Sequence, residues 1–224
     1  MNTGVRLAAS SIWGLVLVCL LLFLPAGTVN YWQAWVFIAA FTIATMIPSI
    51  YLARTDPAAL QRRMRAGPLA EARGVQKVIV FGAFSGFLGM AVFSAFDHRM
   101  GWSQVPAWIC LLGDAMVVIG LLLSQLVVVQ NSYAAATITV EAGQQVATHG
   151  LYKLVRHPMY ATALIMMAGM PLALGSYWGL LFLIPGLAVL VLRILDEEKM
   201  LTQELTGYRE YTQRVRYRLL PYVW

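Results

Sequence analysis

The sequence predicts an all-α polytopic membrane protein with about six transmembrane helices. Hydrophobic residues make up 60% of its 224 residues and charged residues only 12%, whereas soluble domains have about 25% charged residues. Because so few charges cannot cover a water-facing surface of this size, lipid must solvate much of the chain. Two further observations support this class, namely the spacing of the apolar stretches and the one-sided distribution of the basic residues.

Six apolar stretches predict the helices. They run over residues 7–25, 31–52, 78–96, 105–129, 159–174 and 177–195. The first is longer than the apolar part of a secretory signal, so we interpret it as a retained helix. A spanning helix needs about 20 residues, so the fifth stretch is marginal and the count lies between five and six. The short link at Gly175 and Ser176 predicts that the fifth and sixth stretches form a helical hairpin.

The basic residues predict the orientation of these helices. If the N-terminus lies in the cytoplasm, fifteen of the sixteen lysines and arginines lie on the cytoplasmic side and only Arg99 lies outside. This imbalance follows the positive-inside rule and favours an even number of helices with both termini in the cytoplasm. It accounts for the net charge of +6 without nucleic acid as a partner. We expect an integral protein of a bacterial-type inner membrane whose active site faces the cytoplasm.

The chain divides into two parts within one membrane domain. Residues 1–128 hold the first four helices, and residues 129–224 hold the motifs, the hairpin and the tail. The basic segment 54–77 is expected at the headgroup surface. Apolar residues recur in the tail at Leu201, Leu205, Tyr208 and Val215, which predicts an amphipathic helix packed on the membrane or on the protein.

The first group of candidate functional residues surrounds the start of the fifth stretch. It comprises His-Gly-Leu-Tyr at 149–152 and Arg-His-Pro-Met-Tyr at 156–160. Pro158 disfavours helix at His157 and suits the first turn of the helix that follows. His157 is therefore expected at a helix N-cap, beside backbone N–H groups that attract anions. One loop histidine is more often a structural hydrogen bonder, but two linked motifs favour a functional role.

The second group lies where the sixth stretch ends. Arg193 and Glu197 are four residues apart and share a helical face, and Asp196 and Glu198 are next to Glu197. A salt bridge at a helix end is the simpler interpretation of one such pair. Three consecutive acids beside an apolar helix favour a function instead, because charge near hydrocarbon is costly.

Three other residues inside apolar stretches have simpler interpretations. Asp114 is expected to make a structural hydrogen bond to a neighbouring helix. Cys19 and Cys110 are expected to be packing residues, because their apolar surroundings do not fit a disulfide framework or a metal site. The sequence offers no convincing cluster of metal ligands.

The motifs together resemble the isoprenylcysteine carboxyl methyltransferase family of integral membrane enzymes. The resemblance covers residues 130–224, whereas the first hundred residues match only as generic membrane helices. The matching residues, in order and spacing, are Val129-Gln130-Asn131, Gly150-Leu151-Tyr152, Arg156 to Tyr160, Arg193 with Glu197-Glu198, and Gly207-Tyr208 before an Arg-rich end. The chain departs from the family's eukaryotic members by extra residues between Asn131 and Gln144, and by Gln144 where those members often have His.

The resemblance implies S-adenosylmethionine as methyl donor and a lipophilic acceptor, either a small molecule or a lipid-modified substrate, that enters from the bilayer and accepts the methyl group on a carboxylate. It implies three catalytic residues, Arg193, Glu197 and Glu198. Arg193 would orient the carboxylate, and Glu197 would position Arg193 or balance the sulfonium charge. It implies the cofactor-binding residues Gln130, Gln144, Gln145, Val146, Ala147, His149, Leu151, Tyr152, Arg156, His157, Pro158 and Tyr160.

Three alternatives stay open at this point. The Arg-His-Pro signature also resembles membrane phospholipid N-methyltransferases, whose amine acceptor would need Glu197 or Glu198 as a base. It further resembles the C-terminal half of NADPH-dependent sterol reductases, which commonly have Asn where Met159 stands. A non-enzymatic lipid-binding scaffold would explain the helices and charges. It would not explain why His, Tyr, Arg and Glu gather at helix ends around one loop.

Overall fold

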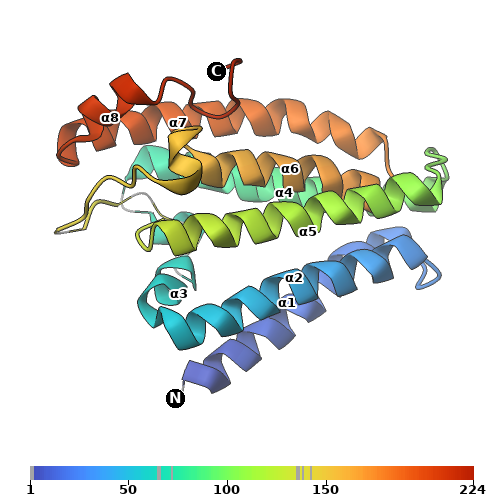
Figure 1. Cartoon of the computed structure of the whole chain (residues 1–224). Coiled ribbons are helices and arrows are strands. Elements are labelled where there is room, and N and C mark those ends of the chain that lie inside the picture. Colours follow the sequence, from blue (N-terminus) through green and yellow to red (C-terminus); the bar gives the residue numbers. More distant parts are fainter. Residues whose placement is uncertain (1–2, 65–66, 72, 135–136, 138, 142) are drawn as a thin grey trace.

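The computed structural model describes residues 3–64, 67–71, 73–134, 137, 139–141 and 143–224, with side chains from Trp13 onward apart from Pro68. This part of the chain is helical and contains no strand, which confirms the all-α class (Figure 1). Its α-helices are α1 (Thr3–Ala26), α2 (Trp32–Thr55), α3 (Pro57–Met64), α4 (Gly74–Met100), α5 (Ala107–Gln130), α6 (Pro158–Ala173), α7 (Leu183–Glu204) and α8 (Tyr208–Arg214). Three 3₁₀ helices, η1 (Pro68–Ala70), η2 (Gly150–Lys153) and η3 (Trp178–Phe182), complete it.

Each of the six apolar stretches forms a helix. Four helical segments in the described part are long and apolar enough to cross a membrane, namely α2, α4, α5 and the continuous segment of η3 and α7. Two others are apolar but shorter, namely the part of α1 from Trp13 to Ala26 and α6. Four candidate spans are therefore established, and six crossings stay a prediction.

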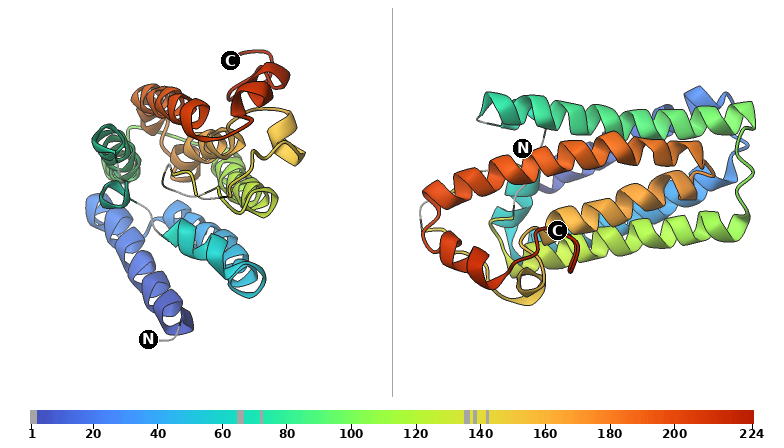
Figure 2. Two further views of the ribbon diagram at one scale, coloured as in Figure 1. Left: turned by 90° about the vertical axis from the view of Figure 1, so that its left-hand side faces the viewer. Right: turned by 90° about the horizontal axis from the view of Figure 1, so that it is seen from above.

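The long helices run in alternate directions and leave two different ends to the bundle (Figures 1 and 2). Short turns at residues 27–31, 101–106 and 174–177 make one end, which we call the turn end. The described residues of segments 56–73 and 131–157, together with α8, make the other, which we call the loop end. Arg99 lies in the last turn of α4 at the turn end. Arg65, one of the fifteen basic residues expected on the other side, lies outside the described residues.

Helices α5 and α6 form the closest packed pair, and glycines permit it. A Cβ atom on Gly113 would lie 2.3 Å from the backbone nitrogen of Ala173, and one on Gly169 would lie 2.7 Å from the carbonyl oxygen of Gly113. Gly120 meets α6 in the same way, 2.9 Å from the carbonyl oxygen of Thr162. Without side chains at these positions, the two backbones approach and pack along their length.

Polar contacts at the turn end hold the predicted hairpin of α6 and α7. Asp97, which is fully buried, accepts hydrogen bonds from Ser103 and from the hydroxyl of Ser176. The hydroxyl of Tyr31 donates to the carbonyl oxygen of Leu174. Three turns that are distant in sequence are thus tied together, and the loop end is left to carry the longer segments.

Three expectations about the elements are wrong. Helix α7 continues to Glu204, so Arg193 and the acids that follow it lie within the helix rather than at its end. The tail is not one amphipathic helix, because Gly207 adopts a left-handed conformation (φ +84°) that separates α7 from α8. Asp114 makes no hydrogen bond to a neighbouring helix, since both carboxylate oxygens are buried without a partner in the described chain.

Candidate active site

A pocket opens at the loop end, between segment 131–147, the start of α6, the second half of α7, and α8. Its polar and aromatic lining comes from Asn131, Tyr133, Thr137, Thr139, Gln144, Gln145, Tyr152, Arg156, His157, Tyr160, Glu197, Tyr208 and Tyr211. Its other lining residues are Ala134, Val146, Ala147, Pro158, Met159, Met200, Leu201 and Leu205. The pocket therefore joins a polar side to an apolar side.

His157 is the N-cap of α6 and Pro158 is the first residue of the helix, as predicted. The C-terminal segment fixes this turn, because the backbone N–H groups of Arg156 and His157 donate to the carbonyl oxygens of Tyr217 and Arg218, both at 2.9 Å. The His157 residue is only 5% exposed, yet it lines the pocket. Its imidazole is therefore held in place beside the space that a ligand would fill.

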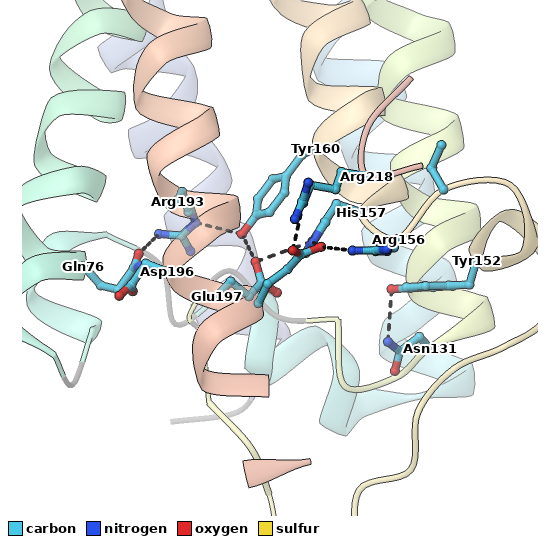
Figure 3. Close-up of polar contacts among 12 residues, drawn as sticks. Gln76, Asn131, Tyr152, Arg156, His157, Tyr160, Arg193, Asp196, Glu197 and Arg218 are labelled. Carbon is cyan, nitrogen blue, oxygen red and sulfur yellow. Dashed lines mark hydrogen bonds and ion pairs between the residues drawn. The ribbon is translucent and has the colours of Figure 1, made fainter. Parts of the chain in front are cut away.

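Glu198 lies behind this turn and ties it to the tail. Its carboxylate accepts hydrogen bonds from Arg156 at 3.1 Å and from Arg218 at 2.8 Å, and it lies 3.3 Å from Nε2 of His157 (Figure 3). Arg156 further donates to the carbonyl oxygens of Thr212 and Val215. Since Glu198 does not line the pocket and is engaged by three side chains, it acts as an anchor for residues that do.

Glu197 and Arg193 share a face of α7, as their spacing predicts, and they meet at Tyr160. The Tyr160 hydroxyl donates to Glu197 at 2.6 Å and accepts from Nε of Arg193 at 2.9 Å (Figure 3). The other two guanidinium nitrogens of Arg193 donate to Gln76 at 3.1 Å and to Glu71 at 3.0 Å. Glu197 therefore faces the pocket, and Arg193 lies one layer behind it.

Two residues of this layer, Glu71 and Gln76, come from the first half of the chain. Glu71 is 3% exposed and Gln76 is fully buried. The Gln76 amide also donates to Asp196, which forms an ion pair with Arg73 at 2.6 Å. No role in the site was predicted for Glu71, Arg73 or Gln76. In the sequence, Gln76 is a polar residue just before an apolar stretch. This position does not indicate that Gln76 contacts Arg193 and Asp196.

The loop before α6 is held by side chains rather than by regular structure. Gln130 accepts a hydrogen bond from the backbone N–H of Leu151 at 2.8 Å, and it packs so closely on Gly150 that a Cβ atom there would lie 2.3 Å from it. Asn131 donates to the Tyr152 hydroxyl at 3.0 Å. Burial raises the pKa of Tyr152 to about 12, against the opposing effect of the Asn131 hydrogen bond. Tyr152 therefore presents a neutral hydroxyl to the pocket.

The structure brings most of the expected residues to one pocket. Of the fifteen, ten line it, namely Gln144, Gln145, Val146, Ala147, Tyr152, Arg156, His157, Pro158, Tyr160 and Glu197. Five do not line it, namely Gln130, His149, Leu151, Arg193 and Glu198. Of these five, Gln130, Arg193 and Glu198 contact lining residues or the loop that carries them. Tyr208 and Tyr211 belong to a third motif of the sequence, Gly207-Tyr208-Arg209-Glu210-Tyr211, for which no binding role was predicted, and both also line the pocket.

One feature of the lining points to a ligand. The Tyr208 hydroxyl is buried and has no hydrogen-bond partner in the described chain. Burial, together with the nearby Glu198 and Glu197, raises the pKa of Tyr208, so this group stays protonated. A buried hydroxyl without a partner costs free energy, about 1–3 kcal/mol. Tyr208 lines the pocket, so this unpartnered hydroxyl belongs to a residue of the pocket wall.

The part of the chain that carries the site is similar to known proteins. The model of the family described as Phospholipid methyltransferase matches residues 108–209, which contain most of the pocket lining. Among curated proteins, the Delta(14)-sterol reductase TM7SF2 of Mus musculus is 36% identical over an alignment 95 residues long that covers 39% of this chain. The matched part spans 22% of the length of that reductase. The site-bearing half of the chain is thus similar to membrane methyltransferases and, over a shorter stretch, to a sterol reductase.

Proposed function

We propose that this protein is an integral membrane methyltransferase that uses S-adenosylmethionine and methylates a lipophilic acceptor. The observation that carries the proposal is the coincidence of the pocket at the loop end with the segment that matches the phospholipid methyltransferase family. The same pocket gathers ten residues that the resemblance to carboxyl methyltransferases singled out. Both families are membrane methyltransferases, so the two likenesses agree on the reaction class.

The pocket suits a cationic cofactor with a polar and an apolar part. Glu197 lines it and supplies a carboxylate opposite a positive charge, and the unpartnered Tyr208 hydroxyl supplies a donor. Val146, Leu201 and Leu205 supply an apolar wall for a ring system. When bound, S-adenosylmethionine supplies an electrophilic methyl group on a positively charged sulfur.

The residues of the chain would orient the reactants and exclude water rather than transform them. His157 and Tyr160 are held by Glu198 and Arg193 respectively, so their positions are set before a ligand arrives. A carboxylate acceptor attacks the methyl carbon directly, and no proton needs to move. An amine acceptor must lose one proton, and the carboxylate of Glu197, which lines the pocket, can accept it.

We propose a carboxylate as the acceptor group, with a phospholipid amine as the second candidate. The carboxylate rests on the order and spacing of the motifs from Gln130 to Arg218, and it needs no base. The amine rests on the family match over residues 108–209. Glu198 is a poor base for the amine reaction, because Arg156 and Arg218 occupy its oxygens.

Calorimetric titration of the detergent-solubilised protein with S-adenosylhomocysteine and, separately, with NADPH tests the proposal. We expect saturable binding of S-adenosylhomocysteine and no binding of NADPH. The likeness to the mouse sterol reductase makes NADPH the informative comparison. Binding of NADPH alone would replace the methyltransferase with a reductase-like enzyme, and binding of neither compound would favour a lipid-binding scaffold.

A further inference from the structure

Helix α3 carries two neighbouring arginines with opposite surroundings. Arg62 forms a bidentate ion pair with Glu141, at 2.8 Å from Nε and 2.9 Å from Nη2, and its guanidinium lies over the ring of Tyr133. The hydrogen bond to Glu141 raises the pKa of Arg62. Arg62 therefore has a structural role, because its ion pair with Glu141 holds α3 to the loop that borders the pocket.

Arg63 has no such partner. Its guanidinium nitrogens contact two neutral atoms at long distance, the Ser124 hydroxyl at 3.4 Å and the sulfur of Met159 at 3.7 Å. None of the ion pairs in the described chain includes Arg63. None of the residues outside the described ranges is Asp or Glu, so none of their side chains can form an ion pair with Arg63.

The position of Arg63 makes this isolation costly. Burial lowers the pKa of Arg63, and no neighbouring acid offsets that effect. A cation that loses water without gaining a counter-ion lowers stability. The chain nonetheless holds it firmly, because Ala59 and Leu60 pack α3 against Leu52 and Val128. A partly buried guanidinium without an acidic partner is well suited to bind an anion.

Met159 connects Arg63 to the pocket. The methionine side chain lines the pocket, and its sulfur accepts a hydrogen bond from Ser124 at 3.0 Å while it contacts Arg63. One flexible side chain therefore separates the guanidinium from the place where the reaction is proposed to occur. The end of α3 lies beside the ends of α5 and α2 at the loop end (Figure 1).

We propose that Arg63 binds an anionic group of the methyl acceptor, a carboxylate or a phosphate, across Met159 from the pocket. The inference rests on the proposed function and makes it narrower, because it requires a lipophilic acceptor that carries an anionic group. A guanidinium forms paired hydrogen bonds with either group. A carboxylate would come from a lipophilic acid, and a phosphate from a phospholipid headgroup.

Binding of three probes to the S-adenosylhomocysteine-saturated protein in neutral detergent tests this subsite. The probes are N-acetyl-S-farnesylcysteine, its uncharged carboxamide, and dioleoylphosphatidylethanolamine. We expect Arg63→Gln to weaken binding of one anionic probe by about tenfold or more, and to leave the carboxamide unchanged. Arg63→Lys should recover part of the loss. Weaker binding of N-acetyl-S-farnesylcysteine would indicate the carboxylate of a lipophilic acid. Weaker binding of dioleoylphosphatidylethanolamine would indicate the phosphate of a phospholipid headgroup.

Arg54→Gln is the matched control, because Arg54 is an exposed cation at the end of α2 near the same loop. It should bind all three probes as the wild type does. Wild-type affinity for S-adenosylhomocysteine in Arg63→Gln shows that this variant is folded. The inference is overturned if the wild type binds neither probe that carries an anionic group, or if Arg63→Gln binds both of them with wild-type affinity. It is also overturned if Arg63→Gln weakens binding of the carboxamide as much as binding of the anionic probes. Failure of the wild type to bind S-adenosylhomocysteine would instead overturn the proposed function.

Discussion

At the scale of single residues, the pocket separates groups that can touch a ligand from groups that hold them. His157 lines the pocket, and its ring lies against Glu198. Arg193 is 8% exposed and does not line the pocket, but it donates to the hydroxyl of Tyr160, which does. This division gives the two residues different expected effects on binding and on turnover.

We therefore expect His157→Ala to weaken S-adenosylhomocysteine binding by about tenfold or more, which corresponds to about 1.4 kcal/mol. Arg193→Ala should leave that affinity within about threefold and lower methyl transfer by about 100-fold or more, because it releases Tyr160 and misplaces the groups beside the acceptor. Calorimetry measures the first quantity, and transfer of a tritiated methyl group into lipid extracts measures the second. Equal loss of cofactor affinity in both variants would contradict the separation of roles.

Removing Arg193 also breaks its ion pair with the buried Glu71, and the loss of one member of a buried pair costs about 3–5 kcal/mol. Arg193→Lys is the variant that controls for this loss. It keeps a positive charge for Glu71 but cannot donate to Glu71, Gln76 and Tyr160 together. A lysine variant that is as stable as the wild type and still inactive would assign Arg193 to positioning rather than to folding.

Local sequence could predict some of this arrangement and not the rest. Pro158 restricts its neighbours, so the N-cap position of His157 follows from two adjacent residues. The helical period places Arg193 and Glu197 on one face. No local rule pairs Arg193 with Gln76, 117 residues away, or Glu198 with Arg156, 42 residues away. These contacts depend on how the helices pack.

At the scale of elements, the short helix α6 is the one that the bundle surrounds. Its 16 residues extend about 24 Å, less than the hydrocarbon core of about 30 Å. None of its residues is exposed, and Met170 and Ala173 are almost completely buried. Because α6 touches neighbours throughout its length, its position is set by packing on α5, and that packing places His157 and Tyr160.

Close approach of α5 and α6 is therefore expected to be essential for stability and for the site. Gly113→Ala would place a methyl group against the backbone of Ala173 and force the helices apart. We expect a loss of about 1–3 kcal/mol, the usual cost of overpacking, measured as a lower Tm in detergent with weaker S-adenosylhomocysteine binding. Gly86→Ala in α4 is the control, since a Cβ atom there meets nothing within 4 Å. Equal melting temperatures of the two variants would show that the pair tolerates separation.

Element prediction failed where polar groups find partners inside the protein. Hydropathy ends the last stretch near residue 195, but α7 continues because Asp196, Glu197 and Glu198 are bound by Gln76, Tyr160 and Arg156. The tail looked like one helix because its apolar residues recur with helical spacing. Gly207 bends the chain instead, so that Leu205, Tyr208 and Tyr211 pack with Val146. The bend supplies one wall of the pocket.

At the scale of the whole molecule, the two ends of the bundle differ in chemistry. The turn end has short connections tied by Asp97 and Tyr31. The loop end carries the pocket, Arg63 without an acidic partner, and the networks around Arg193 and Glu198. Figure 3 shows the contacts of Arg193 with Tyr160 and Gln76. The longer polar segments and the tail lie at the same end, and from the positive-inside rule we predict that this end faces the cytoplasm.

Labelling of single cysteines in sealed, right-side-out membrane vesicles tests that orientation. A variant with Cys19 and Cys110 replaced by Ala would carry one new cysteine, at Ser103 or Trp178 near the turn end, or at Thr55 or Glu210 at the loop end. We expect a membrane-impermeant maleimide to label the first pair in intact vesicles, and the second pair only after permeabilisation. This pattern follows from a water-soluble cofactor that reaches the pocket from the cytoplasm. Labelling of the loop-end pair alone in intact vesicles would place the proposed active site on the opposite face and exclude a cytoplasmic methyl donor.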